Sequence, residues 1–135
     1  MKIDAYVFYN GDCEEAFQFY KSALGGELSI NRYQGSPMES EVPADAKNKV
    51  MHCSLALGSA TLMGADSVGP WQRQRGNNIS LSLATTDEKE AESAFANLSA
   101  GGKVTMPMTQ QFWGAKFGML TDKFGVDWMI SCHNN

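Results

Sequence analysis

The sequence is poor in cysteine, and this shortage already excludes several kinds of protein. Its three cysteines, Cys13, Cys53 and Cys132, are an odd number, lie far apart and have no CxxC spacing. This pattern argues against a disulfide framework and against a zinc knuckle. We therefore expect the three side chains to be buried, reduced thiols.

Basic runs and long apolar stretches are also missing. Eleven Lys and Arg against fifteen Asp and Glu give a net charge of −4, and without a basic run we expect no nucleic-acid partner. No apolar stretch approaches the roughly 18 residues of a membrane span. The start of the chain, residues 1–5, lacks a secretory signal pattern. We expect no membrane contact and a cytoplasmic location.

Several catalytic motifs are absent as well. The sequence has no Ser/His/Asp elbow, no P-loop, no dinucleotide-binding fingerprint and no HExxH. Hydrolase, kinase, dehydrogenase and zincin functions therefore have no residues to support them.

The composition that is present is that of a folded globular chain. With 43% apolar and 19% charged residues, the chain can bury a core and is unlike disordered proteins. Its 135 residues correspond to about one average domain. We expect one domain over residues 1–135, built of two modules of about 1–66 and 77–135.

The first module opens with a strand and a helix. Residues 2–9 alternate with apolar groups on both faces, which predicts an interior strand. Asp12, with Glu15 three positions later, resembles a capping box and predicts a helix start. Gly25 and Gly26 predict its end. The helix presents one apolar stripe, made of Cys13, Ala16, Phe17, Tyr20, Ala23 and Leu24.

The module continues with more strands. Residues 28–33 read as a strand, and residues 34–48, with two prolines, read as an exposed loop that flanks a site. Residues 49–57 and 60–63 are predicted to form a hairpin. One face of residues 49–57 is apolar and is expected to pack on the helix, whereas the other carries Val50, His52, Ser54 and Ala56.

The second module repeats this pattern. A linker over 66–77 is followed by a predicted strand in which Ile79, Leu81 and Leu83 are buried and Asn78, Ser80 and Ser82 lie on the other face. Thr85 or Asp87 can cap the next helix. Its apolar face is Ala91, Ala94, Phe95 and Leu98, Gly101 and Gly102 end it, and the last predicted strands are 117–121 and 127–132.

The two modules are related by a fixed offset. Residues 23–28 (ALGGEL) and 99–104 (SAGGKV) lie 76 positions apart, and each combines a helix end, a double glycine and the start of a strand. Two βαβββ modules explain this agreement.

Paired βαβββ modules resemble the vicinal oxygen chelate superfamily, which includes glyoxalase I, bleomycin-resistance proteins and extradiol dioxygenases. Nearly the whole chain takes part, and its motifs look like the PhnB-like branch: Phe19-Tyr20, Leu24-Gly25-Gly26, His52 before Leu55-Ala56-Leu57-Gly58, Leu62 to Asp66, Phe112-Trp113 and Thr121 to Ile130. The resemblance implies an α+β fold with a U-shaped mixed-sheet cleft, helices on its outer face, and a homodimer.

Metal-using members of this superfamily take two ligands from each half. The four ligand positions that the resemblance implies fall on Ala5, Met63, Asn78 and Met129. None is a usual ligand for Zn, Mn, Ni or Fe(II), because alanine has no donor and a thioether is too soft. The resemblance therefore predicts neither a metal nor another cofactor here, and His52 stays as the one strong candidate ligand.

Small polar and aromatic side chains are predicted to line the cleft. His52 can bind a ligand or act as acid or base, but it can equally be a structural residue bonded to a neighbouring strand. Trp113 can roof the cleft or simply pack, and Trp128 is assigned to the core. Asp122 and Asp127 are explained by an exposed turn. The predicted lining is His52, Ser54, Met63, Asn78, Ser80, Trp113 and Met129.

The first functional hypothesis is a metal-free protein that binds a small, partly apolar molecule in this cleft. The alternative is a metal-dependent lyase or dioxygenase of the same superfamily that uses His52. A purely structural or partner-binding role stays open, since a fold alone does not determine function. The sequence leaves open whether any reaction is catalysed.

Overall fold

A computed structural model describes residues 1–133 of the chain, which divides into a compact unit Met1–Gln74 and a second unit that begins at Arg75. The first unit contains β1 (Ala5–Tyr9), α1 (Cys13–Leu24), β2 (Glu27–Arg32), β3 (Val50–Leu57), β4 (Ala60–Asp66) and three short 3₁₀ turns, Glu39–Glu41, Ala44–Ala46 and Gly69–Trp71. The second contains β5 (Leu81–Thr85), α2 (Glu88–Ser99), β6 (Lys103–Gln110), β7 (Ala115–Thr121) and β8 (Asp127–His133).

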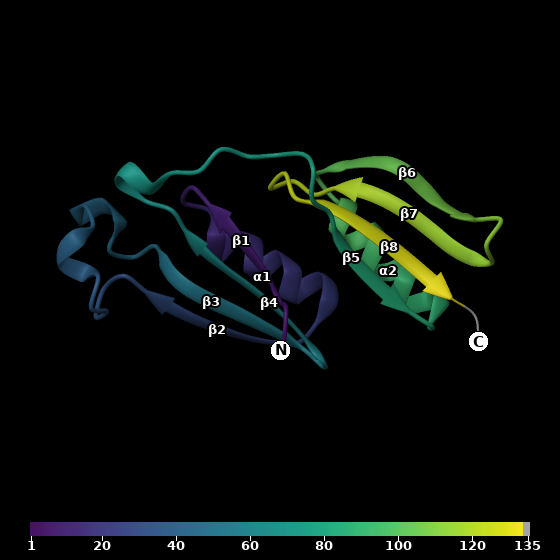
Figure 1. The fold of residues 1–135 in the computed structure, drawn as a ribbon, viewed down its shortest axis with the longest axis horizontal. Helices are drawn as coiled ribbons and strands as arrows, with labels where there is room; N and C mark the ends of the chain where they lie inside the picture. Colours follow the sequence, from purple (N-terminus) through teal and green to yellow (C-terminus); the bar gives the residue numbers. More distant parts are fainter. Residues whose placement is uncertain (134–135) are drawn as a thin grey trace. The chain divides into compact units, whose positions relative to one another are not determined.

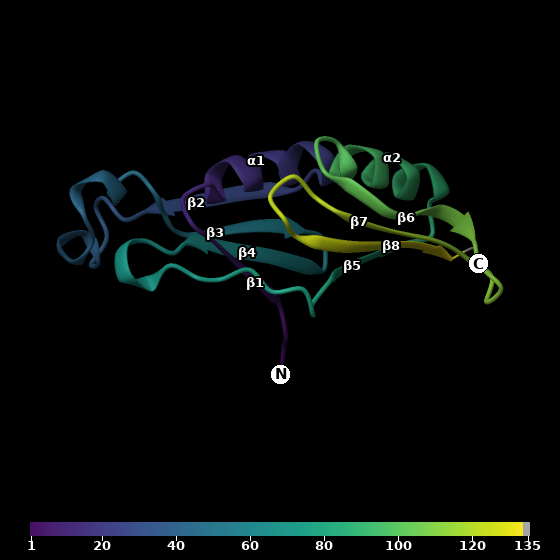
Figure 2. The ribbon, with the colours of Figure 1, turned by 90° about the horizontal axis from the view of Figure 1, so that it is seen from above.

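Each unit is a four-stranded mixed sheet with one helix packed on one of its faces (Figures 1 and 2). The strand order is β1-β4-β3-β2 in the first unit and β5-β8-β7-β6 in the second. In both, the first strand pairs in parallel with the last, and the other neighbours are antiparallel. The predicted α+β fold of two βαβββ modules is confirmed, and β5 begins 76 positions after β1 as the sequence repeat requires.

Strand β1 lies at the edge of its sheet, so the predicted interior position is wrong. The alternation did place Tyr6 and Phe8 together on one face, but these side chains are 38% and 41% exposed. The second apolar face of β1 is therefore a partly exposed aromatic surface, formed by Tyr6 and Phe8.

Helix α1 buries the first four residues of the predicted stripe completely, Cys13, Ala16, Phe17 and Tyr20, whereas Ala23 and Leu24 at its end are only partly buried. Its start differs from the prediction, because the side chain of Asp12 makes no capping hydrogen bond. The side chain of Asp66, at the end of β4, accepts from the backbone N–H groups of Gly11 and Cys13 instead. A carboxylate distant in sequence thus replaces the local cap.

The double glycines end the helices as predicted. Gly25 and Gly26 have φ of +77° and +91°, a conformation that L side chains rarely adopt. A Cβ atom on Gly26 would lie 2.3 Å from the carbonyl oxygen of Ala56 in β3, and one on Gly102 would lie 2.3 Å from that of Thr121 in β7. The repeated glycine therefore lets the chain pass close to the sheet in both units.

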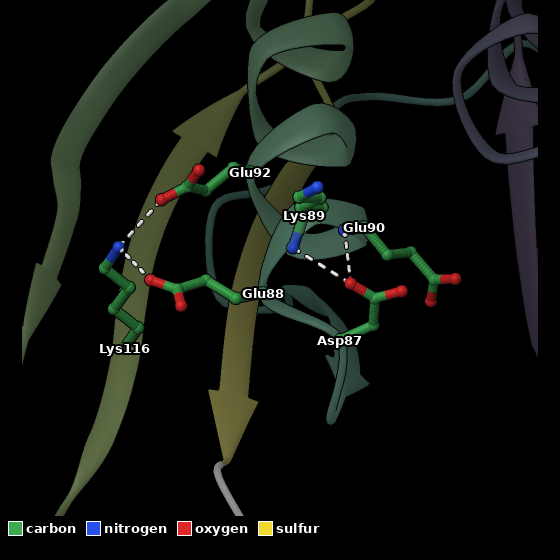
Figure 3. Close-up of polar contacts among 6 residues, drawn as sticks. All are labelled: Asp87, Glu88, Lys89, Glu90, Glu92 and Lys116. Atoms are coloured by element: carbon green, nitrogen blue, oxygen red, sulfur yellow. Dashed lines mark hydrogen bonds and ion pairs between the residues drawn. The ribbon is translucent and has the colours of Figure 1, made fainter.

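Helix α2 is capped by Asp87, one of the two predicted residues, whose carboxylate accepts from the backbone N–H groups of Lys89 and Glu90. On the sheet side, the ammonium group of Lys116 in β7 lies 2.5 Å from Glu88 and 2.7 Å from Glu92 (Figure 3). These two carboxylates raise the pKa of Lys116 and tie the first turns of the helix to β7.

The start of the second sheet is later than predicted. Strand β5 begins at Leu81, so Asn78, Ile79 and Ser80 lie before it, and Ile79 is 76% exposed instead of buried. The alternating sequence pattern begins three residues earlier than the parallel pairing with β8, which starts at Leu81 and Trp128.

Val50 also departs from the alternation, since it is fully buried while His52 and Ser54 on the same predicted face are half-buried. The register of β2 against β3 shifts between Asn31 and Arg32 at this end of the sheet. A β-bulge of this kind leaves no mark in local sequence periodicity.

The cysteines are free and buried, as predicted, and the sulfurs of Cys13 and Cys53 lie 3.6 Å apart.

Within residues 1–133, neither helix has the length and apolar character needed to cross a bilayer.

Candidate ligand-binding site

The face of the first sheet that turns away from α1 carries several of the predicted site residues. We call it the open face and define it by Tyr6, Phe8, His52, Ser54 and Met63. The ladder aligns one row across all four strands, because Ser54 is the partner of both Ser29 and Met63, and Met63 is also the partner of Tyr6. Paired residues point to the same side of a sheet, so the whole row shares this face.

His52 and Tyr6 form the polar centre of the open face. The hydroxyl oxygen of Tyr6 lies 3.0 Å from Nδ1 of His52, and the two rings are 5.6 Å apart. Burial raises the pKa of the Tyr6 phenol, so this group stays protonated and can donate to Nδ1. In that arrangement Nδ1 accepts the bond from Tyr6, and Nε2 carries the ring proton and can donate it to a ligand.

Aromatic rings extend the open face beyond this pair. The ring of Phe8 lies 5.0 Å from that of Tyr6, at an interplanar angle of 37°. The guanidinium of Arg73 sits 3.7 Å from the centre of the Phe8 ring. Sequence reasoning missed Tyr6, Phe8 and Arg73 as site residues, although the alternation of residues 2–9 had already put the two aromatics on one face.

The second sheet presents a different row on the face turned away from α2. Met129 in β8 is the partner of Ser82 and of Met119, and Met119 is the partner of Met106. Ser82 stands 76 positions after Tyr6. Tyr6 pairs with Met63 in the first sheet, and Ser82 pairs with Met129 in the second. The repeat therefore places Met63 and Met129 at equivalent points, one beside a tyrosine and the other beside a serine.

The other predicted lining residues lie outside the strands. Trp113 is in the turn between β6 and β7, is 50% exposed, and packs edge-on against Phe112 and Phe117. Asn78 is exposed in the bend before β5, and Ser80 directly precedes that strand. The structure thus gathers His52, Ser54 and Met63 on one sheet face, whereas Asn78, Ser80, Trp113 and Met129 belong to the second unit.

The donor set does not fit the metal that metal-using members of such folds carry. Ala5 is the partner of Leu62, whose neighbour Leu55 is fully buried beneath α1, so Ala5 points away from the open face. The neighbouring open-face residue is Tyr6, which is bonded to His52. Within residues 1–133, no three His, Cys, Asp or Glu side chains come together in a way that could hold a metal ion.

The first unit also contains a polar pocket of about 380 Å³ beside the start of α1, lined by Gly11, Glu14, Arg32, Asn48, Lys49, Val50 and Asp66. The charged side chains Glu14, Arg32, Lys49 and Asp66 of this pocket already have partners within the protein. Arg32 makes a two-pronged ion pair with Glu14, at 2.8 and 2.9 Å, and Lys49 donates to the carbonyl of Gly11. Asp66 accepts a third backbone bond, from Val50. This network holds α1 to the sheet.

The two acidic residues near the last turn are structural too. Asp122 is buried, contrary to the expected exposure, and accepts from the backbone N–H groups of Phe124 and Val126 and from the indole of Trp128. Asp127 accepts from the hydroxyl of Thr121. Trp128 is buried in the core, as predicted.

Comparison with known proteins gives a consistent family. The model of the Glyoxalase/Bleomycin resistance protein/Dioxygenase superfamily matches residues 2–130. The solved structure of protein PA1353 from Pseudomonas aeruginosa is 40% identical, with a TM-score of 0.89, over 100% of this chain and 99% of that one. The PhnB protein from Bacillus cereus is 27% identical, with a TM-score of 0.77, over 98% and 99%. Protein YjdN of Escherichia coli is 28% identical over 97% of this chain and 95% of its own length.

Proposed function

Because the chain belongs to the Glyoxalase/Bleomycin resistance protein/Dioxygenase superfamily, in its PhnB-like branch, we propose that it binds a small, partly apolar molecule on the open face of its first unit. His52, Ser54 and Met63 line the proposed site together with Tyr6 and Phe8. The observation that carries this proposal is the Tyr6–His52 hydrogen bond on a half-exposed aromatic surface.

The chemistry of these groups suits such a ligand. Small-molecule sites combine mostly apolar walls with a few polar groups that orient the ligand. Tyr6, Phe8 and Met63 supply the apolar area. The imidazole of His52 and the hydroxyl of Ser54 supply directional hydrogen bonds. The exposed parts of the Tyr6 and Phe8 rings are apolar surface in contact with water, and a planar ligand that covers them would gain free energy by removing that surface from water.

A screen of small molecules by thermal shift tests the proposal directly. A molecule that binds the folded state raises the melting temperature by mass action. We expect hits with planar, partly apolar bodies, and we expect their shifts to shrink in His52→Ala. If no member of a broad library shifts the melting temperature, or if the shifts ignore His52, the proposed site is wrong.

We propose that binding needs no metal, since the positions implied by the family carry Ala5, Met63, Asn78 and Met129. Elemental analysis of protein purified without a His tag decides this point, and we expect substoichiometric Zn, Ni, Mn and Fe. A stoichiometric metal that is lost in His52→Ala would instead support the metal-dependent lyase or dioxygenase.

The remaining predicted lining residues are tested singly. We propose Asn78, Ser80, Trp113 and Met129 as further ligand contacts, and alanine at each is expected to weaken binding of a screen hit. Trp113→Ala should also lower the melting temperature, because the indole packs against Phe112 and Phe117. A residue whose replacement leaves the affinity unchanged is to be removed from the site.

We also propose that the chain forms a homodimer and that residues 1–135 act as a single domain. Light scattering is expected to give twice the 14.7 kDa monomer mass, and thermal unfolding is expected to show one cooperative transition. A monomer at micromolar concentration, or two separate transitions, would contradict the respective statement.

A further inference from the structure

A cation lies at one end of the open face. The guanidinium carbon of Arg73 is 3.7 Å from the centre of the Phe8 ring, and Phe8 is in turn 5.0 Å from the ring of Tyr6. Tyr6 is bonded to His52. These four side chains, Arg73, Phe8, Tyr6 and His52, form one continuous set that we call the arginine row.

The backbone at Arg73 is held in place by a residue of the first loop. The side-chain amide of Asn10 donates to the carbonyl of Arg73 at 2.9 Å, and its oxygen accepts from the N–H of Arg73 at 3.1 Å. Asn10 directly follows β1, the strand that carries Tyr6 and Phe8. The same short stretch of chain therefore positions both the aromatic rings and the cation.

Among the residues that the structure describes, Arg73 has no acidic partner. Within residues 1–133, no carboxylate lies within ion-pair distance of its guanidinium, whereas Arg32 is paired with Glu14 and Lys116 with two glutamates. At 3.7 Å the guanidinium carbon is in van der Waals contact with the Phe8 ring. The N–H groups that do not face the ring stay available as donors, in the forked geometry that fits a carboxylate.

We propose that Arg73 makes the site selective for a planar molecule that carries a carboxylate, an inference that rests on the proposed function and specifies its ligand class. The planar body lies against Tyr6 and Phe8, and the carboxylate accepts from Arg73. The Tyr6–His52 pair supplies a second polar contact along the same row.

The test compares 2-naphthoate with its uncharged isostere 2-naphthamide by titration calorimetry at 0.15 M salt. The full chain is used as wild type, as Arg73→Gln and as Arg75→Gln. Arg75 is the matched control, because it is an exposed arginine two positions away whose side chain lies against Gly125 and not against Phe8. Both substitutions remove one positive charge from the same segment.

We expect wild type to bind the naphthoate about three- to thirtyfold more tightly than the amide, the range for a charge-assisted hydrogen bond partly screened by solvent. Arg73→Gln should bring the two affinities to within about twofold, and Arg75→Gln should keep the wild-type ratio. Raising the salt should weaken naphthoate binding to wild type and leave the amide unaffected.

Three results would overturn the inference. Equal affinities of wild type for the two probes would reject the anion preference while leaving the proposed function intact. Equal losses in Arg73→Gln and Arg75→Gln would mean that net charge, and not the arginine row, sets the preference. Binding of neither probe at millimolar concentration would reject the inference, while the open-face site itself would still be decided by the thermal-shift screen and its response to His52→Ala.

Discussion

The hydroxyl of Tyr6 and Nδ1 of His52 lie 3.0 Å apart, although the two residues are 46 positions apart in sequence. One stands on the edge strand β1 and the other on the inner strand β3, with β4 between them. Their contact therefore spans two strand spacings across the open face. The two side chains can meet above β4 because both are long and both lie on the same face of the sheet.

This contact predicts coupling between the two residues. Tyr6→Phe removes the hydroxyl and keeps the ring against Phe8, so we expect the free energy of unfolding to fall by about 0.5–1.5 kcal/mol, the value of one hydrogen bond. In a double-mutant cycle with His52→Ala, the combined loss should be smaller than the sum of the single losses. Urea unfolding measures all four proteins, and strictly additive losses would mean that the bond is absent in solution.

The glycines after α1 predict a contrast between neighbouring positions. Gly25→Ala and Gly26→Ala both place a side chain at positive φ, a strain of about 1–2 kcal/mol. Only the Cβ of Gly26 also meets the Ala56 carbonyl, at 2.3 Å, while nothing lies within 4 Å of Gly25. We expect Gly26→Ala to cost a further 1 kcal/mol or more, roughly, from overpacking. Equal melting temperatures of the two variants would reject the close approach to β3.

Asp66 predicts the largest loss of stability. Its carboxylate is 1% exposed and accepts backbone bonds from Gly11, Cys13 and Val50. A buried donor left without an acceptor costs about 1–3 kcal/mol. The bonds from Cys13 and Val50 are both buried, so Asp66→Ala should lose at least about 2 kcal/mol. The control is Asp12→Ala at the helix start, which makes no side-chain cap bond and should change stability by less than about 0.5 kcal/mol. Chemical denaturation measures both losses. A larger loss of stability in Asp12→Ala than in Asp66→Ala would mean that Asp12 caps the helix after all.

The buried thiols are predicted to be inert in the folded protein. The hydrogen bond between the sulfurs of Cys13 and Cys53, together with burial, raises the pKa of the Cys13 thiol far above its usual value. Since the thiolate is the reactive form, native protein at pH 8 should leave Cys13 and Cys53 unmodified by iodoacetamide while urea-unfolded protein reacts fully. Peptide mapping by mass spectrometry reads each cysteine separately. Rapid labelling of either residue in the native state would contradict the packing described here.

The fold could be predicted because its signals are local and repeated. The apolar stripe of α1, the double glycines and the alternating strands each depend on residues within one element, and the offset of 76 positions joined them into two modules. The face of His52 also followed from alternation within β3. These features need no knowledge of what packs against them.

The errors arose where residues distant in sequence decide the outcome. Asp66 replaced Asp12 as the cap because folding brings the end of β4 to the start of α1. Ile79 is exposed because the pairing of β5 begins only at Leu81. The partners of His52 were missed for the same reason, since neither the bond to Tyr6 nor the stack of Arg73 on Phe8 leaves a periodic signal.

The most direct test of the open-face site measures affinity and stability on one variant, His52→Ala, with the strongest ligand from the thermal-shift screen. Loss of one hydrogen bond to a neutral or charged ligand group costs about 0.5–3 kcal/mol, so we predict an affinity roughly three- to a hundredfold weaker by calorimetry. The melting temperature of the unliganded variant should fall only by the small amount expected for its bond to Tyr6. An unchanged affinity with a large drop in melting temperature would make His52 a structural residue and contradict the account.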